Sequence, residues 1–272
     1  MEAIYGIWYR DVIKFLRDKP RLFGALAMSF LFLIVFGSGL GGAMRSMMAV
    51  GGSTVTFDYA QYMFPGILAV TILNTSIFSA LSVVQDKEYG YFKEILVSPI
   101  PRVFIVLGKG LGGTTVAVMQ SLVMFIFAPL IGLKVTLLMV LQIIPVMFLL
   151  ALTLSGVGLF LASTIQSSTG FQVIVQLLIF PMLFMSGAFF PLTGLPRWLE
   201  LAVIFNPLTY AVDVFKKIIL QLDQMPRELV EAMGLELQVF GYTVSIWQEI
   251  AMIVIVGIVF ISLATRNFVR NT

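Results

Sequence analysis

Long uncharged stretches divide this chain and set its architecture. Residues 22–44, 59–85 and 110–133 contain no charged side chain, and the stretch from 135 to 196 contains none either. A helix needs roughly 20 apolar residues to cross the hydrocarbon core of a bilayer, which is about 30 Å thick. The last stretch would measure about 90 Å as one helix, so it holds two crossings with the polar residues 163–170 as the turn between them.

Together with a final apolar segment that has Glu249 near its start, this pattern predicts an all-α, polytopic membrane protein with six transmembrane helices in a single domain, residues 1–272. We place the spans at about 22–40, 62–84, 107–132, 136–162, 170–190 and 246–265. An even number of spans puts both ends of the chain on the same side of the membrane.

Residues 3–20 have the pattern of an amphipathic helix. Ile4, Ile7 and Trp8 recur at helical spacing, and Arg10 and Lys14 lie on other faces. Such a segment, with its aromatic and basic anchors, is typical of a helix that lies in the membrane interface. The alternative is a basic tail that is simply solvated, and its apolar face would then remain exposed to water.

The segment 191–217 is apolar, but proline and glycine interrupt it repeatedly. Its uncharged part, 201–212, is too short to cross a bilayer, and a run of this length is typical of a re-entrant or interfacial element. We therefore predict a helical hairpin that dips into the membrane from outside, with Asn206 and Pro207 at its bend. The hairpin would line or close the outer end of a pathway.

The composition excludes a soluble protein and several kinds of site. Hydrophobic residues make up 59% of the chain and charged residues 11%, against about 25% charged in soluble domains. The chain contains neither cysteine nor histidine, which excludes disulfides, thiolate metal sites and histidine bases. The net charge of +3 comes from residues that flank the spans, so we expect no nucleic acid partner.

The distribution of the cations predicts the orientation. Eleven of the 17 lysine and arginine residues fall in the N-terminal segment, in the loop 86–109 or in the C-terminal tail. Cytoplasmic loops carry such an excess, so both termini are expected in the cytoplasm. A cleaved signal peptide is disfavoured, because its cationic part would be too long and its apolar run exceeds the usual 7–15 residues.

The loop 86–99 predicts a short amphipathic helix on the cytoplasmic side. Tyr91, Phe92, Ile95 and Leu96 form one apolar face, and Pro99 ends the helix. A helix with aromatic side chains on one face suits a groove on a partner protein. A helix that lies on the lipid headgroups is the other interpretation.

Three sequence motifs resemble those of type-2 ABC exporter permeases, especially the branch of daunorubicin-resistance drug efflux permeases. The first comprises Glu88, Gly90, Tyr91, Phe92, Glu94, Leu96 and Pro99, followed by Arg102 and residues 108–113. The second comprises residues 187–192 with Leu195, Pro196, Arg197 and Trp198, and the third comprises residues 206–210 with Asp213. The number and order of the predicted elements match as well, so the resemblance covers nearly the whole chain.

The resemblance implies roles for two groups of residues. Those implied to couple the chain to an ATPase subunit are Glu88, Gly90, Tyr91, Phe92, Glu94, Leu96 and Pro99. Those implied to form the hairpin or gate are Phe189, Phe190, Pro191, Leu195, Pro196, Trp198, Asn206 and Pro207. The resemblance also implies an assembly of two ATPase subunits with two permease subunits in the inner membrane of a prokaryote, in contact with membrane lipid.

The chain contains no motif that would bind ATP. A P-loop needs G-x-x-x-x-G-K-[ST], and Gly108-Lys109-Gly110 lacks both the upstream glycine and the hydroxyl residue. Gly108 and Gly112 instead have the small-x-x-x-small spacing of helix packing. We therefore expect no enzyme activity and no cofactor in this chain, with ATP and Mg²⁺ bound by the partner ATPase.

Polar residues within spans are candidates for a substrate path, and we single out Asn74, Thr75, Ser79, Gln172 and Gln176. Hydrogen bonding between helices is an equally good explanation for any one of them. The favoured function is export of amphipathic drug-like or lipid-like cargo. One alternative is an ion-driven secondary transporter, disfavoured because charged residues inside the spans are scarce. The others are a permease for a polysaccharide or other glycan, and a membrane scaffold or immunity factor that transports nothing and binds a partner through 86–99.

Overall fold

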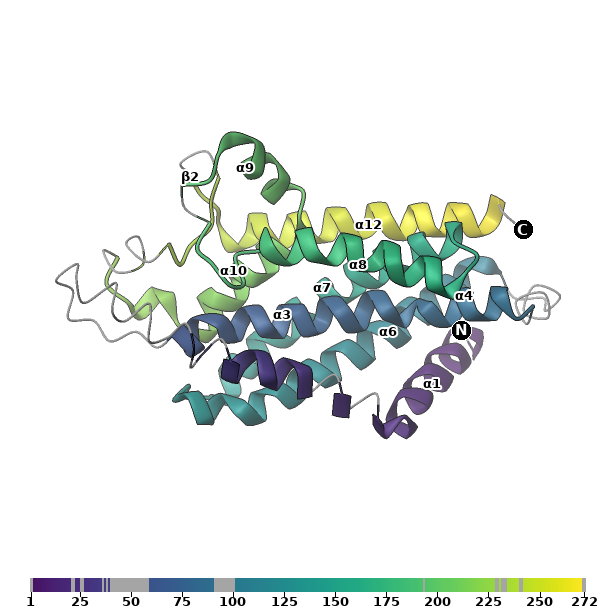
Figure 1. The fold of residues 1–272 in the computed structure, drawn as a ribbon, viewed down its shortest axis with the longest axis horizontal. Coiled ribbons are helices and arrows are strands. Elements are labelled where there is room, and N and C mark those ends of the chain that lie inside the picture. Colours follow the sequence, from purple (N-terminus) through teal and green to yellow (C-terminus); the bar gives the residue numbers. More distant parts are fainter. Residues whose placement is uncertain are drawn as a thin grey trace.

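The computed structural model describes most of the chain as a bundle of helices. The described residues are 2–20, 23–24, 27–35, 37, 39, 59–90, 101–192, 194–227, 230, 234–239 and 242–270. The long helices run along the long axis of the molecule, and both chain termini lie at the same end (Figure 1).

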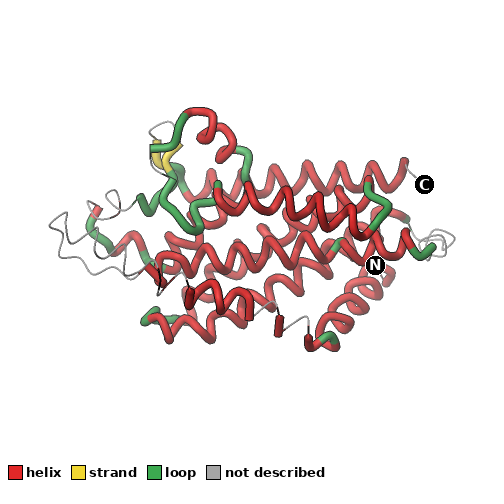
Figure 2. Tube along the Cα trace, in the orientation of Figure 1, coloured by secondary structure: helices red, strands yellow, loops and turns green. Residues whose placement is uncertain are grey.

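The described part of the chain is helical apart from loops and two very short strands (Figure 2). The elements are α1 (Glu2–Arg17), α3 (Tyr59–Ser79), α4 (Leu81–Glu88), α6 (Arg102–Met124), η1 (Phe125–Ile131), α7 (Leu137–Thr164), α8 (Ser168–Phe184), α9 (Arg197–Ile204), α10 (Pro207–Ile219), η2 (Leu222–Gln224), β1 (Gln238–Val239), β2 (Tyr242–Thr243) and α12 (Ile246–Arg270). The two strands pair antiparallel, with Gln238 opposite Thr243.

The all-helical membrane fold is confirmed. Four helical segments are long and apolar enough to span a bilayer, namely Tyr59–Glu88, Arg102–Ile131, Leu137–Thr164 and Ile246–Arg270. The apolar helix α8 has 17 residues, and α9 with α10 forms a bent pair that makes a broken span or a re-entrant loop. The described residues between 23 and 39 are helical, but much of the first predicted span lies outside the described residues, so six spans remain a prediction.

Three spans are longer than predicted, because their helices continue through charged residues near the ends of the apolar stretches. The last span, for example, runs to Arg270 rather than to about 265. The third span begins at Arg102 rather than near 107, and Lys109 is buried inside α6. The second span runs from Tyr59 to Glu88. Residues 86–88, predicted as the start of the 86–99 helix, are therefore the last turn of α4. That turn ends at Gly90, whose φ of +82° is a left-handed conformation that glycine adopts readily.

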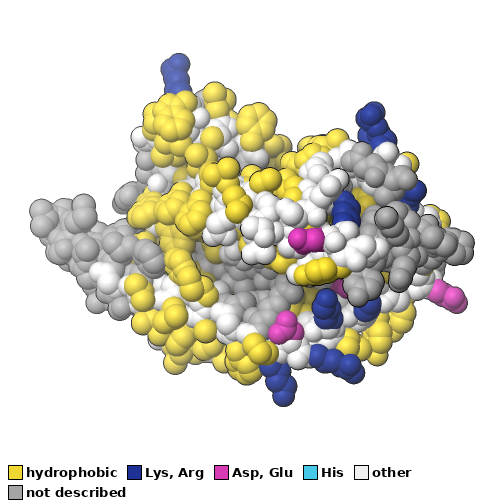
Figure 3. All heavy atoms as spheres, turned by 45° about the vertical axis from the view of Figure 1, so that its right-hand side comes forward, with side chains coloured by type: hydrophobic (Ala, Val, Ile, Leu, Met, Phe, Trp, Pro, Cys, Tyr) yellow, Lys and Arg dark blue, Asp and Glu magenta, His cyan; other side chains and the backbone are white. Residues whose placement is uncertain are grey.

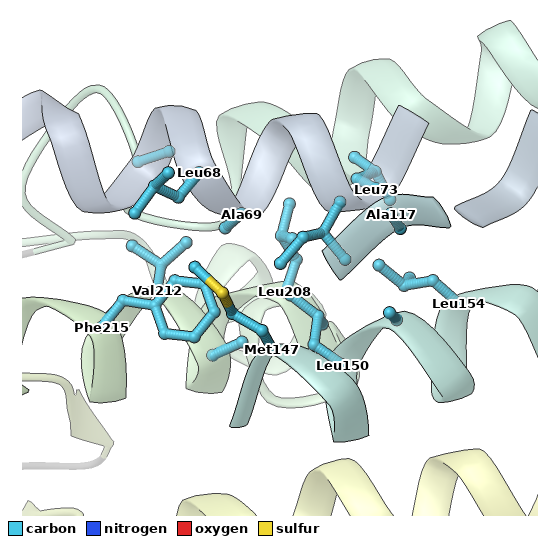
Figure 4. Packing of buried hydrophobic residues seen from close by; sticks show 14 of the residues in the cluster. Leu68, Ala69, Leu73, Ala117, Met147, Leu150, Leu154, Leu208, Val212 and Phe215 are labelled. Atoms are coloured by element: carbon cyan, nitrogen blue, oxygen red, sulfur yellow. The ribbon is translucent and has the colours of Figure 1, made fainter. Parts of the chain in front are cut away.

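The centre of the bundle is formed by α3, α6, α7 and α10. Leu68 of α3, Leu150 of α7 and Phe215 of α10 are among the side chains that pack together there (Figure 4). On the outer side of α7, Gly257 of α12 packs against Thr153, whose hydroxyl donates to the carbonyl of Ile253 at 3.0 Å. Small residues let the helix backbones approach closely in a bilayer.

The N-terminal helix α1 packs against α6. Trp8 Nε1 donates to Thr115 Oγ1 at 2.9 Å, and Lys109 Nζ lies 3.2 Å from an oxygen of Asp11. A side chain at Gly108 would meet Ile7, and one at Gly112 would meet Asp11. The predicted packing role of these glycines is thus confirmed, and the element that they contact is α1.

The bent pair changes direction by 82° between α9 and α10. Asn206 lies at the bend, where its side-chain oxygen caps α10 by accepting from the backbone N–H of Leu208 at 3.1 Å. Pro207 occupies the first turn of α10, where its missing N–H costs nothing. The helix α10 packs against α3, α7 and α12, and it ends at Ile219, two residues beyond the predicted hairpin.

The contact between α3 and the chain before α9 leaves no room for a side chain at Gly66. A Cβ atom there would lie 2.6 Å from backbone atoms of Ala188. We expect Gly66→Ala to lower stability by about 1–3 kcal/mol, the usual cost of overpacking, as measured by thermal unfolding in detergent. Gly6→Ala in α1 is the matched control, because its Cβ would meet no atom within 4 Å. Equal melting temperatures for the two variants would contradict the close packing.

Candidate functional site

A cavity of about 360 Å³ lies between α3, α6 and α8, beside the described part of the first predicted span. Its polar lining residues are Ser29, Thr71, Asn74, Thr75, Gln120 and Gln176. The remaining lining residues are apolar, including Phe180 and Phe189, and no charged residue lines the cavity within the described part of the chain. A concave, mostly apolar space with a few polar groups is typical of a small-molecule site.

Three of the five predicted path residues, Asn74, Thr75 and Gln176, line this cavity. Gln172 lies one turn away on α8 and does not, whereas Ser79 lines a second cavity. Asn74 is held in place by its own helix, because its amide donates to the carbonyl of Val70 at 3.0 Å.

Gln120 of α6 is not among the predicted path residues, yet it is a buried polar residue of the cavity wall. Only 3% of its surface is exposed, and its Oε1 accepts a hydrogen bond from the Thr75 hydroxyl at 2.9 Å. Its Nε2 has no hydrogen-bond partner among the described residues. An unsatisfied donor in such a place costs roughly 1–3 kcal/mol, so a ligand that supplies an acceptor would relieve it.

A second cavity of about 240 Å³ lies between α1, α3, α4 and α6. Its lining includes the charged residues Asp11, Lys14 and Asp18 and the hydroxyl groups of Ser79 and Ser82. Thr75 lines this cavity as well as the first one.

The polar residues that line the two cavities form a stripe along α3 and α4. Thr71, Thr75, Ser79 and Ser82 follow at intervals of four, four and three residues, so they share one helical face. At the end of the molecule that carries the chain termini, the stripe borders the second cavity, which has charged walls. Near the middle of the span it borders the first cavity, which is mostly apolar.

The predicted hairpin residues fall into a buried and an exposed group. Phe189 lines the first cavity, and its carbonyl accepts from the hydroxyl of Tyr59 at 2.7 Å. Asn206 also donates to the carbonyl of Met182 at 2.8 Å, which ties the bend to α8. The buried and partly buried members are Phe189, Pro191, Leu195, Asn206 and Pro207, whereas Phe190, Pro196 and Trp198 are exposed.

A buried cluster of charges joins α10 to α12. Lys217 Nζ lies 2.6 Å from Asp213 Oδ2 and 2.7 Å from Glu249 Oε1, and it donates to the carbonyl of Val244 at 2.9 Å. Glu249 is fully buried, and Asp213 also accepts from the backbone N–H of Leu237 at 2.8 Å. Lys217 is the last residue of the predicted hairpin 191–217, and the structure places it in α10, with its ammonium group between α10 and α12.

The neighbouring Lys216 points to the other side of α10. Its Nζ donates to the Tyr62 hydroxyl at 2.9 Å and to the carbonyl of Gly187 at 2.7 Å, and it lies 4.0 Å from the centre of the Tyr62 ring. The two lysines therefore attach α10 to α12 on one side and to α3 on the other. No group of three or more acidic side chains among the described residues is placed to hold a metal ion.

At the opposite end of the bundle, the residues that flank the segment 91–100 contact the ends of three other helices. Glu88 accepts hydrogen bonds from the backbone N–H and the hydroxyl of Ser168, at the start of α8. Lys87 donates to the carbonyls of Ala162 and Ser163 at the end of α7, at 2.8 and 3.0 Å.

On the other flank of that segment, Arg102 donates to the carbonyl of Val269, near the end of α12, at 2.8 Å. A carboxylate at a helix start and cations at helix ends are favourable placements in the field of the helix dipoles.

Of the residues implied to couple to an ATPase, only Glu88 and Gly90 lie within the described part of the chain. Glu88 is bonded within the chain, to Ser168. The other members of this group, Tyr91, Phe92, Glu94, Leu96 and Pro99, lie outside the described residues.

Residues 2–220 match the family model described as ABC-2 type transporter. The chain belongs to the ABC-2 type transporter family. It is therefore a multi-pass membrane permease subunit that does not hydrolyse ATP itself, and permeases of this family generally pair with an ABC ATPase.

Three relatives illustrate the similarity. The inner membrane transport permease YadH of Escherichia coli K12 is 25% identical over 82% of this chain and 85% of its own length. A Cyanophora paradoxa protein named as the transport permease ycf38 is 25% identical over 78% of this chain and 72% of its own length. An E. coli K12 protein named as the multidrug ABC transporter permease YbhR is 27% identical over 60% of this chain and 45% of its own length.

The buried charge cluster generates a prediction about stability. Removing the cation with Lys217→Met leaves two carboxylates buried without their partner, and breaking a buried pair costs about 3–5 kcal/mol. We expect a clear loss of thermal stability in detergent, measured against Lys134→Met, which removes an exposed lysine.

Placing Lys217→Met in an Asp213→Asn, Glu249→Gln background tests the pairing itself. The methionine substitution should cost much less there than in the unchanged protein, because no buried carboxylate loses a counterion. An equal cost in both backgrounds would mean that the lysine acts through packing alone.

Proposed function

We propose that this permease subunit exports amphipathic, drug-like or lipid-like cargo from the cytoplasm, driven by ATP hydrolysis in a separate subunit. The observation that carries the proposal is that Thr75 lines both cavities and lies on a continuous polar stripe along α3 and α4. The path would begin at the cavity beside α1 and continue into the apolar cavity between α3, α6 and α8.

The chemistry of the two cavities suits a cargo with a polar and an apolar part. The cavity beside α1 offers carboxylates, a lysine and hydroxyl groups, and the deeper one offers aromatic and aliphatic walls with a few amides. A volume of about 360 Å³ falls within the usual range of small-molecule sites. A glycan would leave its many hydroxyl groups unpaired against such walls, so this alternative is disfavoured.

Ion-driven transport is the second candidate, and the buried cluster of Asp213, Lys217 and Glu249 is the observation that favours it. Buried ionisable groups within a membrane domain often mark ion pathways. Here each carboxylate is paired with the same lysine in a helix contact, which argues for a structural role. Transport by reconstituted permease that follows a proton or sodium gradient without ATP would support the second candidate instead.

Several parts of the assembly belong to the proposal as well. We place the permease as a dimer in the inner membrane of a prokaryote, with both termini in the cytoplasm and with two ATPase subunits that bind ATP and Mg²⁺. The excess of lysine and arginine at the end that carries both termini supports this orientation. Phe190 and Trp198 near the opposite end would contribute to an outer gate, since their side chains are exposed there.

The free amide donor of Gln120 provides a test of the cavity. We expect Gln120→Leu to weaken the apparent affinity for an amphipathic fluorescent cargo about tenfold, because a hydrogen bond worth about 1.4 kcal/mol is lost. The measurement is ATP-dependent cargo uptake into inverted vesicles that contain the permease and its ATPase. Gln172→Leu is the matched control, since Gln172 lies outside the cavity and should leave uptake unchanged. Unchanged uptake by the Gln120 variant would exclude this cavity as the path.

Two of the residues implied to couple to the ATPase predict different defects. Phe92→Asp should prevent the ATPase from copurifying with the permease, because it puts a charge on the apolar face proposed to dock. Glu88→Gln should leave the complex intact but slow transport, because it weakens the link from this segment to Ser168 of α8. Loss of the ATPase in both variants would place Glu88 in the docking surface instead.

A further inference from the structure

A groove of about 500 Å³ runs between the first turns of α6 and the last turns of α12. Val103 and Leu107 of α6 form one wall, and Ile261 and Val269 of α12 form part of the other. The groove lies at the end of the molecule where both termini are found (Figure 1), and it shares no lining residue with the two cavities described above.

Two arginines of α12 line the groove. Arg266 and Arg270 line it, are exposed, and form neither a hydrogen bond nor an ion pair with any described residue. Arg102, which bonds the carbonyl of Val269, adds a third positive charge nearby. No acidic side chain lines the groove within the described part of the chain. In the view of Figure 3, most of the visible lysine and arginine side chains gather on the right-hand half of the molecule.

The rest of α12 presents an apolar surface beside this groove. Only 17% of its most apolar stretch is buried inside the molecule, and Ile255, Ile258 and Val259 are exposed. Because the chain is a membrane permease, this surface faces either lipid or another protein. Arg266 and Arg270 lie in the last turns of α12, at the end of the span. This places them at the level of the lipid headgroups, where they can contact phosphate groups.

We propose that this groove binds an anionic phospholipid of the inner leaflet. The phosphate would accept hydrogen bonds from Arg266 and Arg270, and an acyl chain would lie along Val103, Leu107 and Ile261. Basic pockets between spans on the cytoplasmic side commonly bind anionic headgroups. The hydroxyl groups of Ser262 and Thr265 line the same groove and suit the polar glycerol backbone. The choice of leaflet rests on the proposed orientation, with both termini in the cytoplasm, whereas the site itself depends neither on the cargo nor on the direction of transport.

The full-length permease is purified in a neutral detergent, and phosphatidylglycerol or phosphatidylcholine of equal chain length is added. Native mass spectrometry then counts the lipid molecules that remain bound to the protein. We expect phosphatidylglycerol to be retained preferentially. An Arg266→Gln, Arg270→Gln variant should bind it about 30-fold more weakly, which follows from about 1 kcal/mol for each cation at 1.4 kcal/mol per tenfold change.

Two further variants separate this site from general charge attraction. Arg17→Gln with Lys19→Gln removes the same charge from the same end of the molecule, outside the groove, and should leave binding unchanged. Val103→Trp should fill the apolar part of the groove and weaken phosphatidylglycerol binding while both arginines remain. Inorganic phosphate should not displace the bound lipid, because it lacks the acyl chain.

Several results would overturn the proposal. Equal retention of the two lipids, or equal losses in the groove variant and the α1 variant, would mean that no specific lipid site exists. Displacement by inorganic phosphate would reduce the groove to an anion site. A groove variant that keeps its lipid but changes the oligomeric state, or loses the ATPase, would assign this face to a second copy or to the ATPase.

Discussion

Hydrocarbon offers no hydrogen-bond partners, so each polar group that this chain places inside the bundle must find one within the protein. The helix α10 illustrates the consequence. Its two adjacent lysines point to opposite sides, Lys216 to Tyr62 of α3 and Lys217 to Glu249 of α12. Because unpaired charges would be costly there, these bonds fix how the bent pair sits between the two spans. The same requirement attaches α1 to α6, through Lys109 and Asp11.

The cavity between α3, α6 and α8 departs from this rule. Gln120 leaves its amide donor without a partner among the described residues, although its carbonyl oxygen is satisfied by Thr75. The hydroxyl groups of Ser76 and Ser155 and the Oε2 atom of Glu249 also have no hydrogen-bond partner among the described residues, but none of these three residues lines the cavity. An incomplete network beside a space of about 360 Å³ is an arrangement that a ligand can complete. Elsewhere in the bundle the polar groups mainly hold helices together, so binding is expected where an unpaired donor lies beside a cavity.

The sequence predicted the helices well and their polar contacts poorly, for a physical reason. Spans follow from hydropathy, a local property, and the bend at Asn206 follows from a local proline. The pairing of Lys217 with Glu249 joins residues 32 positions apart, which no local pattern reveals. The same holds for the contact of Lys109 with Asp11, which lie 98 positions apart. Gln172 and Gln176 also look equivalent in the sequence, but only Gln176 reaches the cavity, because that depends on how α8 lies against α3.

The contacts of Glu88 change how coupling to an ATPase is best understood. The resemblance implies that this residue docks on the partner, yet its carboxylate bonds Ser168 at the start of α8. On the other flank of the segment, Arg102 bonds the end of α12. A displacement of the segment by the ATPase would therefore move helix ends directly, as rigid bodies. Because α8 forms a wall of the cavity, a displacement of Glu88 would move α8 and thereby change the proposed cargo site.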